Sequence, residues 1–427
     1  MCVLLTLREV NILAMNKKRV AVIGAGIIGV TTAYELAQKG FEVTVFDKNQ
    51  TCSEESSFAN GGVISPGYIT PWASPLIFRR IVKEQFAKHA SILMRTPNFE
   101  TLKWLSQSIQ ASKSERYWRH RQALQKLALM TQSRIKELVQ SLGLDLEQSQ
   151  GYNIIYRSER HFELAKSSLP YLTDLGIAFQ ILDSTSLYEK EPALESQTPF
   201  VGAIHFPDDQ VINCRQFALT LRDEAEKIGV HFEFKSMVEP LSSDNPKRLV
   251  VNGKPQHFDH VVMCAGMGSL HLLKSLGMTI PLTPVYGYSM TAIIKEPLDA
   301  PRCGIMDEKY KVTVVRQGNR VRIGGIMEFG GEAKIQNPKA IKTLYKVLED
   351  WFPKATDMGQ QIQIWKGARA MLPKGSPLVG ATPHPGLWLN LGHGSSGWAT
   401  SCGSAQVLAG LLTEEIPKTD WMELSLS

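Results

Sequence analysis

Short apolar segments predict buried strands at residues 20–23, 43–46, 258–266 and 387–391. The first two flank a helical stretch and so predict a β-α-β unit, and the last leads into a predicted helix at residues 399–412. Asn213 stands where an N-cap is expected, before a helix that runs to Gly229 and a strand at residues 230–234. This alternation of strands and helices is typical of an α/β protein.

The segments between these units have a different pattern. After a polar, glycine-bearing loop at residues 53–67, a composition rich in Leu, Lys, Gln and Arg predicts a long helical region up to about Gly143. Strands are predicted at residues 152–156 and 202–207, with a helix at residues 159–175 between them. Residues 280–330 alternate strands and turns, which predicts an antiparallel sheet.

The turn after the first strand carries the fingerprint Gly24-x-Gly26-x-x-Gly29. Gly24 allows a tight turn, Gly26 lets the backbone approach a pyrophosphate, and Gly29 lets helix and strand pack closely. Asp47 ends the second strand, where a carboxylate can bind ribose hydroxyls. Around this fingerprint we expect the following residues to bind the dinucleotide: Val20, Val22, Ile23, Gly24, Ala25, Gly26, Ile27, Ile28, Gly29, Tyr34, Asp47 and Lys48. The fingerprint alone leaves NAD and FAD open.

A second glycine-rich turn follows the last predicted strand, at residues 392–398, and precedes another helix. A nicotinamide-binding domain does not need such a turn. A flavin does, because the negative charge that develops on the reduced ring is stabilised by a helix N-terminus and free N–H groups. The two turns together favour FAD over NAD.

Composition limits the class of protein. A chain of 427 residues with 43% hydrophobic and 21% charged residues is typical of a globular enzyme of two domains. The six cysteines have no paired spacing, so we expect neither a metal site nor a disulfide framework, and a cytoplasmic location. Residues 1–14 lack a positively charged start, so we interpret them as a dispensable start ahead of Met15 and not as a signal peptide.

Positive charge is concentrated at residues 77–126, which carry eleven Lys and Arg against three Glu. Within this segment, Ile77, Ile81 and Phe86 alternate with cations at helical spacing. We favour a helix packed on its own domain and keep a peripheral contact with the cytoplasmic face of the inner membrane as the alternative. No nucleic-acid-binding module accompanies the charge, so we do not expect nucleic acid as a partner.

Three segments carry a family resemblance over most of the chain, from Lys18 to about Glu415: residues 56–72, residues 307–325 and residues 387–404. They resemble the D-amino-acid oxidase superfamily of FAD-dependent oxidoreductases, and within it the bacterial D-amino acid dehydrogenases of the small-subunit type. The resemblance implies a Rossmann-like FAD-binding domain with glutathione-reductase-like topology and an interleaved α+β substrate domain built on an antiparallel sheet. The expected FAD-binding parts are residues 16–85, 201–275 and 366–420, and the expected substrate-domain parts are residues 86–200 and 276–365.

The same resemblance assigns the remaining site residues. It implies that FAD is also bound by Ser57, Asn60, Gly61, Gly62, Val63, Ile64, Val238, Ala265, Gly266, Gly392, His393, Gly394, Gly397 and Trp398. It implies further that Arg369 binds the substrate carboxylate, which suits a planar guanidinium. Tyr288 and Tyr310 are candidates to line the substrate pocket. His393 is a weaker catalytic candidate, because between two glycines it is better suited to shaping the loop.

The implied activity is oxidative deamination of a D-amino acid such as D-alanine, with hydride transfer from Cα to flavin N5 and electrons passed to a quinone or another respiratory acceptor. Three positions depart from the family pattern, at Tyr286, Ala370 and Lys374, and all are expected on the substrate side. Two alternatives therefore stay open. One is a related amine oxidase or dehydrogenase of the glycine, sarcosine or hydroxyproline type, and the other is a non-catalytic FAD-binding electron-transfer subunit.

Overall fold

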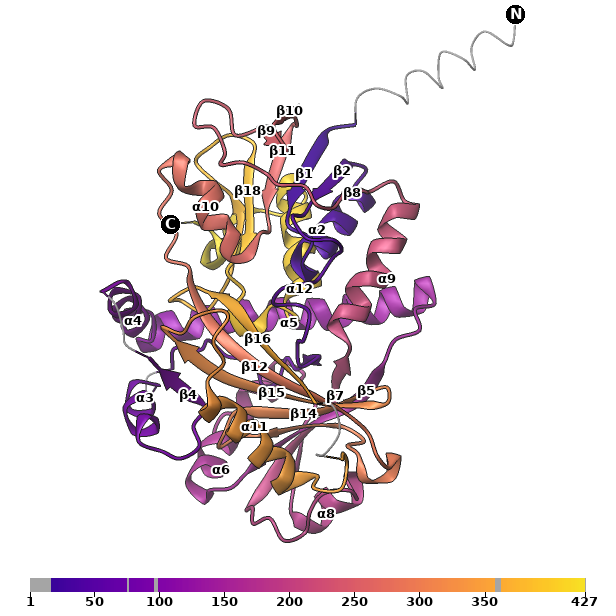
Figure 1. Ribbon diagram of the computed structural model, residues 1–427, viewed down its shortest axis with the longest axis vertical. Helices are drawn as coiled ribbons and strands as arrows, with labels where there is room; N and C mark the ends of the chain where they lie inside the picture. Colours follow the sequence, from indigo (N-terminus) through magenta and orange to yellow (C-terminus); the bar gives the residue numbers. More distant parts are fainter. Residues whose placement is uncertain (1–16, 75–76, 96–98, 358–361, 427) are drawn as a thin grey trace, which may run out of the picture.

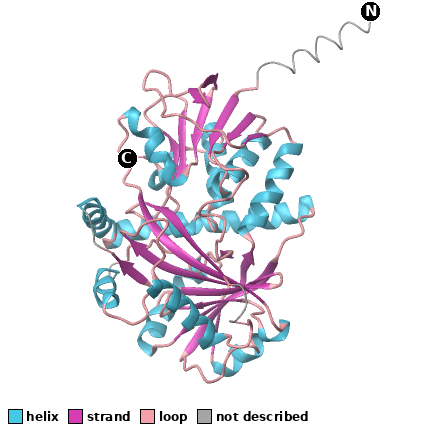
Figure 2. Cartoon of the chain, viewed as in Figure 1, coloured by secondary structure: helices cyan, strands magenta, loops and turns pink. Residues whose placement is uncertain are grey.

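The computed structural model describes residues 17–74, 77–95, 99–357 and 362–426. Figure 1 shows two parts, one built on each of two large sheets, with the long helix α5 (Ser114–Leu142) crossing between them. Figure 2 shows that helices flank the sheets of both parts. The interpretation of residues 1–14 concerns residues outside the described part of the chain.

The first part contains a six-stranded sheet in the described residues, in the order β17-β18-β11-β1-β2-β8. Its strands are β1 (Arg19–Ile23), β2 (Glu42–Phe46), β8 (His231–Glu233), β11 (His260–Met263), β17 (Leu378–Ala381) and β18 (Leu387–Leu391). The pairings are parallel except that between β17 and β18. Its helices are α2 (Ile27–Gln38), α9 (Cys214–Lys227), α10 (Ser269–Leu273) and α12 (Ser401–Leu412), and a separate hairpin joins β9 (Arg248–Val251) to β10 (Lys254–His257).

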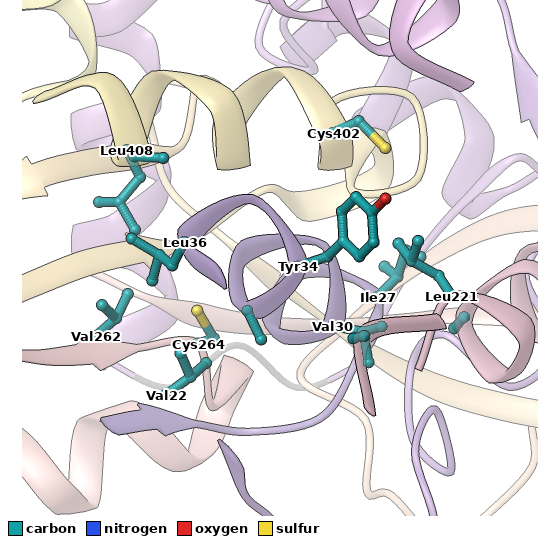
Figure 3. Packing of buried hydrophobic residues seen from close by; sticks show 14 of the residues in the cluster. Val22, Ile27, Val30, Tyr34, Leu36, Leu221, Val262, Cys264, Cys402 and Leu408 are labelled. Carbon is teal, nitrogen blue, oxygen red and sulfur yellow. The ribbon is translucent and has the colours of Figure 1, made fainter. Parts of the chain in front are cut away.

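The core of this part lies between the parallel sheet and the helices α2, α9 and α12. Val22 and Val262 of the sheet, Leu36 of α2 and Leu408 of α12 are buried in one cluster, as Figure 3 shows. The predicted N-cap of α9 is confirmed, because the Asn213 side chain accepts a hydrogen bond from the Gln216 N–H group at 3.2 Å. This packing fixes the positions of the strand ends that build the site.

The second part contains a larger, mostly antiparallel sheet. Its main order in the described residues is β16-β12-β15-β14-β13-β5-β7-β3, with β4 beside β15 and β6 beside β7. The strands are β3 (Val63–Ile64), β4 (Ile92–Met94), β5 (Gln148–Tyr156), β6 (Gln180–Leu182), β7 (Gly202–Ile212), β12 (Thr283–Ile293), β13 (Gly304–Asp307), β14 (Val312–Gln317), β15 (Arg320–Phe329) and β16 (Gln363–Met371). The β5–β13 and β4–β15 pairs are parallel, so the sheet is mixed.

The helices around this sheet are α3 (Ile77–Gln85), α4 (Phe99–Ala111), α6 (Glu159–Lys166), α7 (Leu169–Asp174), α8 (Ser184–Lys190) and α11 (Pro338–Trp351). The helical region expected up to Gly143 thus contains three helices in its described residues, and β4 separates the first from the other two. The helix expected at residues 159–175 is divided into α6 and α7. Pro170 lies in the first turn of α7, where its missing N–H group costs no helical hydrogen bond.

The segment boundaries expected from the sequence differ from the sheets in three places. β3, β7 and β16 belong to the larger sheet, although residues 16–85, 201–275 and 366–420 were expected in the FAD-binding part. The physical reason is pairing: β3 pairs with β7, β7 pairs with β5 and β16 pairs with β12. The chain therefore crosses between the two parts within these expected segments.

β7 also carries a buried carboxyl group, Asp209, which accepts a hydrogen bond from the Ser65 hydroxyl. Burial raises the pKa of Asp209 to about 8, whereas an Asp in an unfolded chain has a pKa of about 4. Between these values the folded protein binds the extra proton, so stability should fall as pH rises from about 4 to about 8.

We therefore expect Asp209→Asn to be more stable than the wild type at pH 8, by roughly 1–3 kcal/mol, with a smaller difference at pH 5. Urea unfolding of both proteins at the two pH values measures this. An equal difference in the free energy of unfolding at both pH values would show that Asp209 does not titrate as its burial implies.

Candidate active site

The site begins at one edge of the six-stranded sheet. β1, β2, β11 and β18 are parallel, so their carboxyl ends lie together at that edge. The residues that follow these strands are Gly24, Asp47, Ala265 and Gly392, and none is more than five residues from the last residue of its strand. Four segments that are distant in the sequence thus meet at one place.

Two glycines make the turn after β1 compatible with this crowding. A Cβ atom on Gly24, whose φ is +104°, would lie 2.7 Å from the Cys264 carbonyl oxygen. A Cβ atom on Gly29 would lie only 1.8 Å from the carbonyl oxygen of Gly24. At Gly26 the nearest atom would be the Ser57 hydroxyl oxygen, at an ordinary 3.6 Å. Gly24 and Gly29 are therefore required by the packing of the protein itself. Gly26 is not, and its missing side chain leaves space in the cavity.

Polar groups at the start of α2 are fixed by hydrogen bonds. The Asp47 carboxylate accepts the Ala25 N–H group at 2.6 Å and the Asn49 N–H group at 2.8 Å. The Ser57 hydroxyl accepts the Ile27 N–H group at 3.2 Å. These bonds hold Asp47 and the loop at residues 57–64 against the helix N-terminus, whose positive end attracts anions.

A cavity of about 1860 Å³ runs from this edge into the larger sheet. It exceeds the roughly 300–1,000 Å³ of an ordinary small-molecule pocket, so it has room for a dinucleotide and a second molecule. The expected site residues that line it are Ile23, Gly24, Gly26, Ile27, Ile28, Asp47, Lys48, Ser57, Asn60, Gly61, Val63, Val238, Ala265, Gly266, Tyr288, Tyr310, Arg369, Gly392, His393, Gly394, Gly397 and Trp398.

Seven other expected residues lie outside the lining: Val20, Val22, Ala25, Gly29, Tyr34, Gly62 and Ile64. Val20, Val22, Tyr34 and Ile64 are buried in the hydrophobic core. Figure 3 shows the Tyr34 side chain extending from α2 toward Cys402 of α12, because this face of α2 packs on another helix and not on the cavity. Ala25 and Gly29 support the turn through the contacts described above.

The C-terminal loop closes the site from the side of α12. The Trp398 indole N–H group donates to the Gly62 carbonyl at 3.0 Å, which joins this loop to residues 57–64. His393 is buried, and its Nε2 atom lies 3.1 Å from the Ser404 hydroxyl. Burial lowers the pKa of His393 to about 3, so its imidazole is neutral near pH 7. A neutral, hydrogen-bonded imidazole suits a role in shaping the loop.

Arg369 extends from β16 into the cavity. Its guanidinium donates to the Ile326 carbonyl at 2.7 Å and to the Gly325 carbonyl at 3.4 Å, and no carboxylate of the described residues pairs with it. Burial lowers its pKa to about 10, so it stays charged near pH 7. A buried cation without a carboxylate is costly unless a ligand supplies the anion.

Sequence reasoning missed two residues that support this guanidinium. A Cβ atom on Gly287 would lie 2.4 Å from the Arg369 Cζ atom, so only glycine leaves room for the arginine. Ile326, which accepts from Arg369, has a φ of +60°, an outlier for a β-branched residue. No local signal marks either residue, because their roles depend on how β12, β15 and β16 are aligned.

Gly287→Ala should therefore displace the guanidinium and lower kcat/KM for a carboxylate substrate by about tenfold or more, because overpacking costs about 1–3 kcal/mol. FAD content should not change, since Gly287 adjoins the arginine and not the β1 turn. Two measurements test this: kcat/KM for the substrate, and the ratio of flavin absorbance to protein absorbance in the purified protein. An unchanged kcat/KM would mean that the observed position of Arg369 is not the functional one.

The two expected tyrosines differ in what they offer the cavity. The Tyr288 hydroxyl lies 2.5 Å from a Glu328 oxygen and accepts the Asn337 N–H group at 3.0 Å, so it is already engaged. The Tyr310 ring packs against the guanidinium of Arg157, whose Cζ atom lies 5.4 Å from the ring centroid. Tyr288 therefore presents its ring to the cavity, and Tyr310 lines the cavity beside Arg157.

Of the three departures from the family pattern, only Ala370 lines the cavity. The Lys366 ammonium lies 4.4 Å from the ring centroid of Tyr286. Lys374 donates to the Glu423 carbonyl at 2.9 Å. The substitutions at Tyr286 and Lys374 thus support neighbouring segments and do not reshape the cavity lining.

The residues present fit FAD. Gly26 lines the cavity at the helix N-terminus, with no atom closer than 3.6 Å to an added Cβ atom. Gly266, with a φ of +52°, has open space around it and lines the cavity at the end of β11. Both positions let a ligand approach the backbone, as a pyrophosphate requires.

Comparisons with known proteins agree with this geometry. The structure is similar to glycine oxidase from Bacillus cereus ATCC 14579, with a TM-score of 0.73 and 19% identity over 96% of this chain and 99% of that one. For iminodiacetate oxidase from Chelativorans sp. BNC1 the TM-score is 0.70, with 19% identity over 94% and 98%. For L-proline dehydrogenase from P. horikoshii the TM-score is 0.71, with 16% identity over 96% of this chain and 97% of that one.

At these identities, the similarity to solved structures shows the fold. The family is shown separately, because the model described as FAD dependent oxidoreductase matches residues 19–411, which include both glycine turns and Arg369. The predicted fold class and the predicted cofactor are therefore confirmed. The chain belongs to the DAO family of FAD-dependent oxidoreductases.

Proposed function

We propose that this protein oxidises the carbon–nitrogen bond of D-amino acids such as D-alanine, giving a 2-oxo acid and ammonia. One observation carries the proposal: Arg369 is a half-buried cation without a carboxylate partner among the described residues, and it lines the same cavity as the dinucleotide turns. An amino acid supplies the missing carboxylate. The D configuration rests on the resemblance of residues 56–72, 307–325 and 387–404 to D-amino acid dehydrogenases.

The chain's own residues would bind and orient the substrate. Arg369 can donate two parallel hydrogen bonds to the carboxylate, which fixes the direction of the Cα–H bond. The neutral imidazole of His393 and the loop at residues 392–398 would exclude water without adding charge. When bound, FAD supplies the hydride acceptor. This arrangement needs no nucleophilic side chain.

Two rivals are distinguished by a substrate panel. The related reaction is oxidation of glycine, sarcosine or hydroxyproline, and the other rival is an FAD-binding electron-transfer subunit without turnover. Oxygen consumption and dye reduction should be measured with D-amino acids, their L enantiomers and N-methyl amino acids. We expect D-amino acids to reduce the dye fastest. A preference for glycine or sarcosine supports the related oxidase, and no turnover with any amine supports the subunit.

We also propose that electrons pass to a quinone or another membrane acceptor, and that α3 and α4 contact the bilayer. Ile77 and Ile81 of α3 pack inward in one cluster with Trp104 of α4. The other faces carry exposed apolar side chains, with Phe86 just beyond α3 at 90% exposure and Leu102 on α4 at 53%. Exposed cations accompany them at Arg79, Lys83 and Lys103, a combination that suits an anionic membrane surface.

The double variant Phe86→Ser/Leu102→Ser should lower the fraction bound to anionic vesicles by about fivefold or more, since each side chain loses the gain from apolar burial. Sedimentation with vesicles measures this. Leu298→Ser/Ile293→Ser is the matched control, because both of these side chains are exposed elsewhere on the molecule. Equal pelleting of both double variants and the wild type would refute the membrane contact. Among the described residues, no helix is both long and apolar enough to cross a bilayer.

A further inference from the structure

The cavity lining contains a second arginine without an anionic partner, and this one is buried. Arg121 lies on α5, is 8% exposed and lines the cavity. Its guanidinium is enclosed by two rings: the Cζ atom lies 4.8 Å from the centroid of Trp118 and 5.1 Å from that of Tyr171. The two rings meet edge to face, with their centroids 5.4 Å apart. Cation–π contacts of this kind hold the guanidinium in place.

Arg121 lacks an anionic partner. No carboxylate of the described residues forms an ion pair with it, and its Nε–H group, which is buried, has no hydrogen-bond acceptor. Other arginines of the cavity lining are either paired or exposed: Arg80 pairs with Glu84, Arg157 pairs with Asp307 and Asp350, and Arg79 and Arg160 are exposed. Among the described arginines that line the cavity, Arg121 is buried and Arg369 is half-buried, and neither has a carboxylate partner, so both favour an anion from outside the chain.

Contacts around α5 connect the Arg121 region to the segment that follows Arg369. The neighbouring residue, His120, lies with its Nδ1 atom 3.0 Å from the hydroxyl of Ser376. Tyr117, one turn before Arg121, forms a hydrogen bond with Thr70, and the loop around Thr70 continues to Pro71, which adjoins Gly375. The helix that carries Arg121 is thus held against the chain just beyond β16.

We infer that Arg121 binds a carboxylate at the end of the substrate side chain, so that the preferred substrates are amino acids with an acidic side chain. This inference rests on the proposed amino-acid oxidation and names its substrate class. Arg369 would bind the α-carboxylate and Arg121 would bind the second carboxylate, because both line the same cavity. Exposed Arg160 adds positive potential to the same lining and favours the approach of a dianion.

The test compares acidic amino acids with their uncharged counterparts. kcat/KM is measured for D-aspartate, D-glutamate and D-2-aminoadipate, and for D-asparagine and D-glutamine, in the wild type and in Arg121→Met. We expect at least one acidic substrate to exceed its amide by about 10- to 100-fold in the wild type. The chain length that gives the largest ratio identifies which acid spans the two arginines. Arg121→Met should remove the ratio, mainly through KM, and leave kcat/KM for D-alanine within a few fold.

Arg119→Met is the matched control, because Arg119 lies on the same helix but is exposed and contacts Glu115 at 3.8 Å. It should keep the acid-to-amide ratio. If acids and amides react equally in the wild type, or if Arg119→Met lowers the ratio as much as Arg121→Met, the inference is wrong.

A binding measurement separates this inference from the proposed reaction. Malonate, succinate and glutarate are titrated into the FAD-bound protein, with acetate for comparison, and the change in flavin absorbance is recorded. Arg121→Met should weaken dicarboxylate binding by about tenfold or more and leave acetate binding unchanged. This result with no amine turnover would contradict the proposed function but keep the anion site. Turnover with equal dicarboxylate affinity in both proteins would contradict the anion site alone.

Discussion

Arg369→Met should lower kcat/KM for D-alanine by about three orders of magnitude, because loss of a buried, charge-assisted partner costs about 2–5 kcal/mol. Methionine nearly preserves the apolar volume but removes the bidentate donor. Because the Arg369 guanidinium donates hydrogen bonds only to carbonyl groups of β15 in the described residues, the loss should appear in substrate kinetics and not in FAD content. Steady-state dye reduction together with the flavin absorbance ratio measures both.

Arg369→Lys is the informative companion variant. A lysine keeps the charge but donates to a carboxylate from a single ammonium group, so we expect intermediate activity. Added guanidinium ion should partly restore turnover in Arg369→Met by entering the vacated space. Equal activities in the wild type, Arg369→Lys and Arg369→Met would exclude Arg369 as the carboxylate ligand.

The second large effect is expected at Gly26. In Gly26→Ala the new Cβ atom makes only an ordinary contact with the protein, 3.6 Å from the Ser57 hydroxyl oxygen, and the backbone φ of −68° suits alanine. The FAD-free protein should therefore keep its stability to within about 0.5 kcal/mol. FAD affinity should fall by about tenfold or more, because the methyl group occupies the space that the pyrophosphate needs.

Gly29→Ala provides the contrast. Its Cβ atom would lie 1.8 Å from the Gly24 carbonyl oxygen, so this variant should unfold or lose stability even without FAD. Thermal unfolding of the FAD-free proteins and titration with FAD distinguish the two effects. If Gly26→Ala binds FAD as tightly as the wild type, the turn after β1 does not approach the cofactor.

The sequence was most informative where local chemistry decides the structure. The turn at Gly24 could be predicted from adjacent residues. Glycine is required there by the positive φ and by the close approach of the Cys264 carbonyl group. The N-cap at Asn213 is similarly local. Such features need only a few neighbouring residues, so they could be predicted before the rest of the fold was known.

Strand pairing was less predictable. The local sequences of β7 and β16 do not identify their partner strands, and only their pairing with β5 and β12 assigns them to the larger sheet. The environment of Tyr34 could not be predicted for the same reason. Its face of α2 is covered by α12, and α12 lies more than 350 residues later in the sequence. Partner choice over such distances depends on global packing.

The site shows both cases. Arg369 was predicted from the family resemblance, but Gly287, which leaves room for its guanidinium, is a neighbour only through the pairing of β12 with β16. Arg121 has no motif at all. Its significance comes from two enclosing rings on α5 and α7 and from the lack of a carboxylate partner in the described residues. A site whose residues come from several helices and strands cannot be identified from any one segment of the sequence.

Anaerobic mixing of the purified protein with D-alanine is the direct test of amino-acid oxidation by this protein. We expect that the wild-type protein is yellow, that D-alanine bleaches the absorption band of its oxidised flavin, and that L-alanine does so far more slowly. Arg369→Met should contain as much flavin but bleach about a thousandfold more slowly at the same subsaturating concentration of D-alanine. A yellow protein that no amino acid bleaches, or one in which Arg369→Met bleaches as fast as the wild type, would contradict the account.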